Sequence, residues 1–194
     1  MKVLGLTGGV GMGKSTTAQF LRERGAQVVD TDDLARQVVE PGQPAWSEVR
    51  EVFGPSIVGL DGKLRRDELA RRVFSNPADR QRLEALLHPR IRDLWRTQLA
   101  AWREQGCAVA VVVIPLLFET GAEAELGPIL CTACSSGSQR QRLHARGWPA
   151  AQIEQRIQAQ WPVERKMALS NHVVWTEAGL DVHAAQLDLI TALK

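Results

Sequence analysis

A glycine-rich segment near the N-terminus ends in lysine and serine, with the spacing of a phosphate-binding loop. Residues 8–15 read GGVGMGKS and match the pattern G-x-x-x-x-G-K-[ST]. In such a loop the backbone N–H groups and the following helix N-terminus hold phosphate oxygens. The lysine reaches the β- and γ-phosphates, and the serine hydroxyl ligates Mg²⁺. We therefore expect a site for ATP or a similar nucleotide, rather than a glycine turn with a chance lysine. Its residues are Gly8, Gly9, Val10, Gly11, Met12, Gly13, Lys14, Ser15 (also the metal ligand) and Thr16.

Acidic residues follow two segments of β-strand character. Asp32 comes just after a short strand at 27–30, and in a parallel sheet ligands bind at the carboxyl ends of strands. A carboxylate there can accept a proton from an acceptor hydroxyl, or hold Mg²⁺ through water. The alternative is a helix N-cap, which we favour for Asp33 but not for Asp32. Glu119 follows the central strand, either as a substrate or metal contact or as a polar loop residue.

Arginines concentrate in two zones, 60–105 and 138–166, although the whole chain carries a formal charge of only +2. Arg142 and Arg146 are four residues apart and share a helix face, where they could clamp the γ-phosphate. The alternative is a solvated helix surface. His88 precedes a proline, which favours a helix boundary over a catalytic role. Either Trp148 or Trp161 could lie near a nucleotide base.

The elements around these residues alternate between strands and helices. Strand, glycine loop, helix and strand in residues 3–30 form a βαβ unit. The run of β-branched residues at 109–114 is typical of a central parallel strand that is buried on both faces. We therefore predict an α/β fold, a P-loop doubly wound parallel sheet with a helical insertion and a small helical lid. Further strands are expected at 129–133 and 173–176, and helices at 15–24, 139–146, 151–165 and 182–193. The single domain divides into a core (1–33, 106–137, 167–194), an insertion (34–105) and a lid (138–166).

The composition narrows the class of protein. The chain has 194 residues, of which 44% are hydrophobic and 24% charged, as in a folded globular protein. It lacks an apolar run of about 20 residues and the features of a signal peptide, so we expect no membrane association. Three cysteines indicate a cytoplasmic location, and the lone C-x-x-C at 131–134 predicts a buried strand end rather than zinc. The small net charge argues against a nucleic-acid partner. No oligomeric state is predicted.

The reaction class follows from what accompanies the loop. A GTPase would carry Asp-x-x-Gly and Asn-Lys-x-Asp motifs, and the chain has neither. A compact P-loop chain with basic insertions instead indicates a small-molecule kinase, in which a lid closes over the phosphates and excludes water.

The chain resembles the dephospho-coenzyme A kinase family over nearly its whole length. The resemblance lies in GLTGGVGMGKST at 5–16, VDTD at 29–32, DGKLRR at 61–66, HP at 88–89 and PLLFE at 115–119. Residues Gln139, Arg142, Arg146, Arg156 and Gln160 resemble the lid of that family. The P-loop alone is shared by many kinases, whereas the ordered set is specific.

The resemblance implies transfer of the γ-phosphoryl group of ATP to the ribose 3′-hydroxyl of dephospho-coenzyme A. It implies that Asp32 is the acceptor base and that the insertion receives the coenzyme A moiety. Catalytic residues would be Asp32, Lys14, Arg142 and Arg146; substrate contacts would be Asp32, Arg65, His88, Pro115, Leu116 and Glu119.

The chain departs from the family pattern at Ile114, at 131–136 and at 170–176, where the adenine-side contacts would lie. The alternatives left open are another nucleoside or sugar kinase of the P-loop class and a degenerate nucleotide-binding protein.

Overall fold

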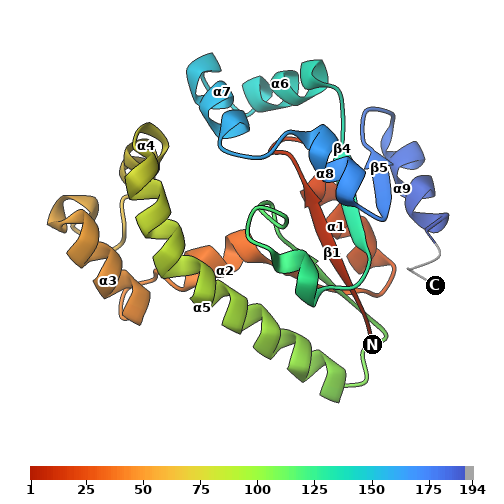
Figure 1. Ribbon diagram of the computed structural model, residues 1–194, viewed down its shortest axis with the longest axis horizontal. Coiled ribbons are helices and arrows are strands. Elements are labelled where there is room, and N and C mark those ends of the chain that lie inside the picture. The colour runs from red at the N-terminus through yellow and green to blue at the C-terminus, as the bar shows by residue number, and fades with distance from the viewer. Residues whose placement is uncertain (191–194) are drawn as a thin grey trace. The chain divides into compact units, whose positions relative to one another are not determined.

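The computed structural model describes residues 1–190, and the chain divides into two compact units. The first unit comprises Met1–Asp30 and the chain from Leu99 onward, and the second comprises Thr31–Gln98. Each unit has a core of its own. In Figure 1 the labelled strands all lie in the first unit, and every label in the second unit belongs to a helix.

A five-stranded parallel sheet forms the centre of the first unit, in the order β2-β3-β1-β4-β5. Leu4 of β1 lies beside Val111 of β3, and Leu6 of β1 lies beside Leu130 of β4. Such residues form interior strands because a sheet covered on both faces needs apolar side chains on both sides. The strands are β1 (Lys2–Gly8), β2 (Gln27–Asp30), β3 (Val109–Val113), β4 (Ile129–Ala133) and β5 (His172–Trp175).

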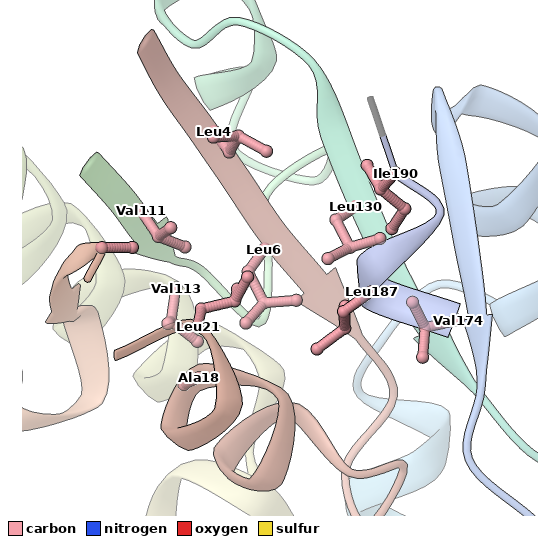
Figure 2. Close-up of a cluster of buried hydrophobic side chains, with 11 residues drawn as sticks. Leu4, Leu6, Ala18, Leu21, Val111, Val113, Leu130, Val174, Leu187 and Ile190 are labelled. Atoms are coloured by element: carbon pink, nitrogen blue, oxygen red, sulfur yellow. The ribbon is translucent and has the colours of Figure 1, made fainter. Parts of the chain in front are cut away.

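Helices cover both faces of this sheet, so the predicted doubly wound α/β fold is confirmed. On one face, side chains of α1 (Lys14–Glu23) and α9 (Leu180–Asp188) meet the strands in one buried cluster (Figure 2). Its five leucines are at most 1% exposed, and burial of each such side chain contributes roughly 1.5–3 kcal/mol. They are Leu4, Leu6, Leu21, Leu130 and Leu187. Helix α8 (Val163–Leu169) contacts β1 and β4. A short 3-10 helix, η2 (Ala122–Glu125), lies between β3 and β4 along the chain.

The predicted helix at 151–165 is wrong, because the chain forms two helices there. Helix α7 (Ala150–Gln158) ends before Trp161, and α8 starts after Pro162. Proline has no N–H to donate and disfavours helical geometry in the residue before it, so the helix cannot continue. Helix α6 (Ser136–Ala145) lies close to its predicted position. The last helix, predicted over 182–193, spans Leu180–Asp188, so its predicted extension through 189–190 is wrong; residues 191–193 lie outside the described residues.

The second unit is helical. It contains α2 (Thr31–Gln37), α3 (Pro44–Phe53), η1 (Pro55–Ile57) and α4 (Arg66–Ser75), and α5 (Pro77–Glu104) starts in it and ends in the first unit. Val49, Phe53 and Ile57 lie at the centre of its core. The expected boundary at His88 is wrong, because α5 runs through Pro89. A proline removes one hydrogen bond, and apolar packing along the rest of the helix offsets that loss. Among the described residues, no helix is long and apolar enough to cross a membrane.

Candidate active site

The P-loop joins the end of β1 to the start of α1. Gly11 and Gly13 adopt φ angles of 75° and 89°, a region that residues with a Cβ rarely occupy. The loop then turns directly into α1, whose first residue is Lys14. The Lys14 Nζ donates to the carbonyl oxygens of Gly8 at 2.8 Å and Gly9 at 3.0 Å. A cation therefore spans the loop at the positive end of a helix dipole, an arrangement that favours a bound anion.

Two segments far away in sequence pack against the loop glycines. A Cβ at Gly11 would lie 2.9 Å from Cγ of Leu143 in α6, and one at Gly13 would lie 3.0 Å from Cγ2 of Thr176. A Cβ at Gly9 would lie 2.8 Å from Sδ of Met12. The glycines therefore permit close packing as well as the backbone turn.

Arg142 is the predicted phosphate clamp that the structure brings to the loop. Its guanidinium donates to Oγ1 of Thr176 at 2.9 Å and also to the Thr176 carbonyl oxygen. Thr176 Oγ1 in turn donates to the carbonyl of Met12 at 3.3 Å. Arg146 lies one turn further on, at the C-cap of α6, with an exposed side chain. Thr176 links Arg142 to the loop, and its role was not apparent from the sequence.

The buried thiols report the charge around the loop. Burial raises the pKa of Cys131 to about 11, while the positive charges of Lys166 and Lys14 act in the opposite direction. Burial likewise raises the pKa of Cys134, opposed by Arg142. Three cations thus act on the thiols of β4 and of the residue after it, while the negative charge of Glu177 acts in the opposite direction on Cys134.

The segment after β3 is held by a buried ion pair. Lys166 of α8 is 0% exposed, and its Nζ lies 2.8 Å from Oε1 of Glu119 and 2.7 Å from the Pro115 carbonyl oxygen. The backbone N–H of Trp161 donates to the same Glu119 oxygen at 2.9 Å, and Thr7 Oγ1 donates to the Pro115 carbonyl at 3.3 Å. Glu119 Oε2 is buried without a hydrogen-bond partner among the described residues. Glu119 is therefore part of the scaffold next to the loop, and its contact with substrate stays a prediction, as do those of Pro115 and Leu116.

Helix α9 fixes the first turns of α1. The His183 ring is 2% exposed, and its Nε2 lies 2.8 Å from Oγ1 of Thr17. Thr17 Oγ1 also donates to the Gly13 carbonyl oxygen at 3.2 Å, so this contact reaches the end of the P-loop. Burial, assisted by the positive charge of Arg142, lowers the pKa of His183.

Asp32, Arg65 and His88 lie in the second unit. Asp32 is exposed in the first turn of α2, which starts immediately after β2. The N-cap interpretation of Asp33 is wrong, because α2 already begins at Thr31 and Asp33 instead pairs with Arg36 at 3.2 Å. A carboxylate in a first turn still stabilises the helix through its dipole.

The other two side chains of this unit differ in exposure. Arg65 is exposed at the N-cap of α4. His88 is half-buried, and burial lowers its pKa, opposed by Glu84 and assisted by Arg92. The ring is therefore neutral near pH 7, so it can offer one donor and one acceptor to a ligand.

The two tryptophans of the predicted lid each have an arginine over one face. The guanidinium carbon of Arg156 lies 4.3 Å from the ring centroid of Trp148, and that of Arg165 lies 3.3 Å from the centroid of Trp161. These contacts stabilise both rings. Base stacking on Trp148 or Trp161 stays a prediction.

Comparison with known proteins identifies the family. The dephospho-CoA kinase family matches this chain over residues 2–181. The chain belongs to the dephospho-CoA kinase family. The dephospho-CoA kinase of Anaeromyxobacter dehalogenans is 42% identical over 193 residues, which cover 99% of this chain and 92% of that protein. The resemblance seen in the sequence is thereby confirmed, and this family member is a kinase.

Two solved structures share the fold of this chain. The crystal structure of TT1252 from Thermus thermophilus matches with a TM-score of 0.84 and 34% identity, covering 98% of this chain and 96% of that one. A shikimate kinase from Acinetobacter baumannii matches with a TM-score of 0.56 and 14% identity, covering 100% and 95% of the two chains. The second likeness concerns the fold alone.

Proposed function

We propose that this chain transfers the γ-phosphoryl group of ATP to the ribose 3′-hydroxyl of dephospho-coenzyme A, giving coenzyme A and ADP. The observation that carries the proposal is an intact phosphate loop in a chain that matches the family over residues 2–181. Lys14 and Ser15 stand at the first turn of α1, where a triphosphate would lie at the helix N-terminus.

In the proposed reaction each residue has one task. Backbone N–H groups of the loop and the Lys14 ammonium hold the β- and γ-phosphates. Arg142, which is held beside the loop by its hydrogen bond to Thr176, neutralises charge that develops on the transferred group. Asp32 accepts the proton of the acceptor hydroxyl as the new P–O bond forms and ADP leaves.

The donor set around the loop fits Mg²⁺ carried in by the nucleotide. Within residues 1–190, no group of three His, Cys, Asp or Glu side chains could hold a metal ion. Ser15, however, presents an exposed hydroxyl at the first turn of α1. This suits a cation that takes most of its ligands from phosphate and water. When bound, Mg²⁺ supplies charge neutralisation between the phosphates.

The test is ADP release with MgATP, with and without dephospho-coenzyme A, followed by the mass of the product. We expect acceptor-dependent release and one added phosphoryl group. Asp32→Asn should leave MgATP binding unchanged within about twofold and lower kcat by at least about 100-fold. Lys14→Ala should lower both binding and kcat, because it removes a phosphate contact. Full acceptor-dependent turnover by Asp32→Asn contradicts its role as base, and acceptor-independent ADP release contradicts the proposed function.

A further inference from the structure

Both backbone polar groups of Val10, in the middle of the P-loop, are taken by glutamine side chains. The Val10 N–H donates to Oε1 of Gln160 at 2.9 Å, and Nε2 of Gln139 donates to the Val10 carbonyl at 2.8 Å. Gln139 lies in α6 with only 5% of its surface exposed, and Gln160 follows α7. These contacts span 150 and 129 residues of sequence.

The two glutamines act with opposite polarity. A backbone N–H can only donate and a backbone carbonyl can only accept, so Gln160 must present its oxygen and Gln139 its nitrogen. Neither amide can turn over without losing its bond. The orientation of each side chain is therefore fixed by the loop itself.

These bonds set the direction of two peptide groups in the loop. No peptide bond in the described chain is cis, and in a trans peptide the C=O and the next N–H point in opposite directions. Because Gln139 holds the Val10 carbonyl, the N–H of Gly11 points to the other side, away from α6. Because Gln160 holds the Val10 N–H, the Gly9 carbonyl points away from Gln160, where it accepts from Lys14 Nζ at 3.0 Å and from the Met12 N–H at 3.2 Å.

The same two residues mark the ends of one helical pair. Between them lie the rest of α6 and the whole of α7, which are joined by the paired bonds of Arg140 to Glu154 at 2.7 and 3.1 Å. A shift of this pair would pull on both glutamines, and hence on both peptide groups at Val10. Two side chains of the predicted lid thus bond the backbone of the same loop residue, Val10.

We propose that Gln139 and Gln160 are positioning residues for the nucleotide phosphates. They hold the loop with the Gly11 N–H presented as a phosphate donor and the Val10 carbonyl turned away from the phosphate oxygens. The inference rests on the proposed function, in which the loop binds the phosphates of ATP. It adds residues that act through the loop backbone rather than by touching the nucleotide.

The experiment removes each bond without adding charge. Gln139→Met and Gln160→Met keep the length of the side chain but lose the donor and the acceptor, respectively. Gln141→Met and Gln158→Met are matched controls, since Gln141 is exposed on α6 and Gln158 is exposed at the end of α7, two residues before Gln160. The measurements are the Kd of a non-hydrolysable MgATP analogue, the KM for each substrate, kcat and Tm. Because the Kd needs no turnover, it tests the inference even in an enzyme that uses another acceptor.

We expect each of the two variants to weaken MgATP binding about fivefold to tenfold, as for one lost hydrogen bond, with the KM for dephospho-coenzyme A unchanged within twofold. The controls should bind as the wild type does. Unchanged MgATP affinity in both variants, with or without a lower Tm, would mean that the bonds serve only folding, and it overturns the inference. A wild-type protein that binds MgATP but does not phosphorylate dephospho-coenzyme A overturns the proposed function instead.

A second pair of variants uses the opposite polarity. Gln160→Glu keeps an oxygen that accepts from the Val10 N–H, whereas Gln139→Glu places an oxygen against the Val10 carbonyl. Gln141→Glu and Gln158→Glu give the cost of the added charge alone. After that correction Gln139→Glu should weaken binding at least fivefold more than Gln160→Glu. Equal effects of the two would contradict the proposed geometry.

Discussion

Replacement of Lys166 by methionine tests how strongly the first unit depends on its buried ion pair. The Lys166 side chain is 0% exposed and that of Glu119 is 13% exposed, so water does little to screen either charge. In Lys166→Met the Glu119 carboxylate keeps the Trp161 N–H but loses its cation. Removal of one partner of such a pair costs about 3–5 kcal/mol, because a buried charge is left uncompensated. At roughly 2–4 °C per kcal/mol for a chain of this size, we expect Tm to fall by about 10 °C.

Thermal and urea unfolding, followed by circular dichroism, measure this loss. Arg36→Met is the matched control, because Arg36 and its partner Asp33 are 63% and 62% exposed. It should change the unfolding free energy by less than about 1 kcal/mol. The double variant Lys166→Met with Glu119→Gln should recover at least about half of the loss, since the neutral amide can still accept from Trp161. A loss below about 1 kcal/mol in Lys166→Met would refute the assignment of a tightly coupled buried pair.

Three further predictions concern His183, Cys131 and Gly13. The lowered pKa of His183 favours its neutral form in the folded state, so its contribution to stability is complete above the unfolded pKa near 6.5 and is lost as pH falls toward the folded value. His183→Gln should flatten the dependence of Tm on pH below about 6.5. Because Cys131 is buried with its pKa raised to about 11, Cys131 should react with a disulfide reagent at pH 8 far more slowly than the half-buried Cys107, and equal rates in Cys107→Ser and Cys131→Ser proteins would contradict this. Gly13→Ala should destabilise more than Gly25→Ala, since both glycines have φ near +90° but only Gly13 has a neighbour within 4 Å, and equal Tm values would show that Thr176 moves aside at no cost.

The phosphate loop and the parallel sheet could be predicted because their signals are local. The glycine spacing at 8–15 and the apolar run at 109–114 each lie within one short segment. The break between α7 and α8 was missed, although Pro162 was a local signal for it. Helical periodicity on both sides of the proline outweighed that signal, which is a common error when short helices follow one another.

The supports of the loop could not be predicted, because they come from contacts far apart in the sequence. Thr176, Gln139 and Lys166 reach their partners through the packing of the last third of the chain against β1 and β4. The pattern and spacing of residues within one segment do not show which distant residues will contact it. Lys166 offered one weak signal, a lysine three residues after Val163 on the face of a short helix where an apolar residue would be expected.

The crowding around the loop glycines restricts which substitutions this chain can accept in the loop. Gly11 is constrained twice, by its φ of 75° and by Leu143 in α6, so no single change elsewhere makes it replaceable. Gly9 has no positive φ, and the atoms nearest to a Cβ there belong to the side chains of Met12 and Gln139. Both side chains must shift before alanine fits at position 9, and the end of Met12 is flexible. Of the two glycines that the general motif leaves open, position 9 is therefore the more replaceable, whereas position 11 is restricted by its backbone conformation as well.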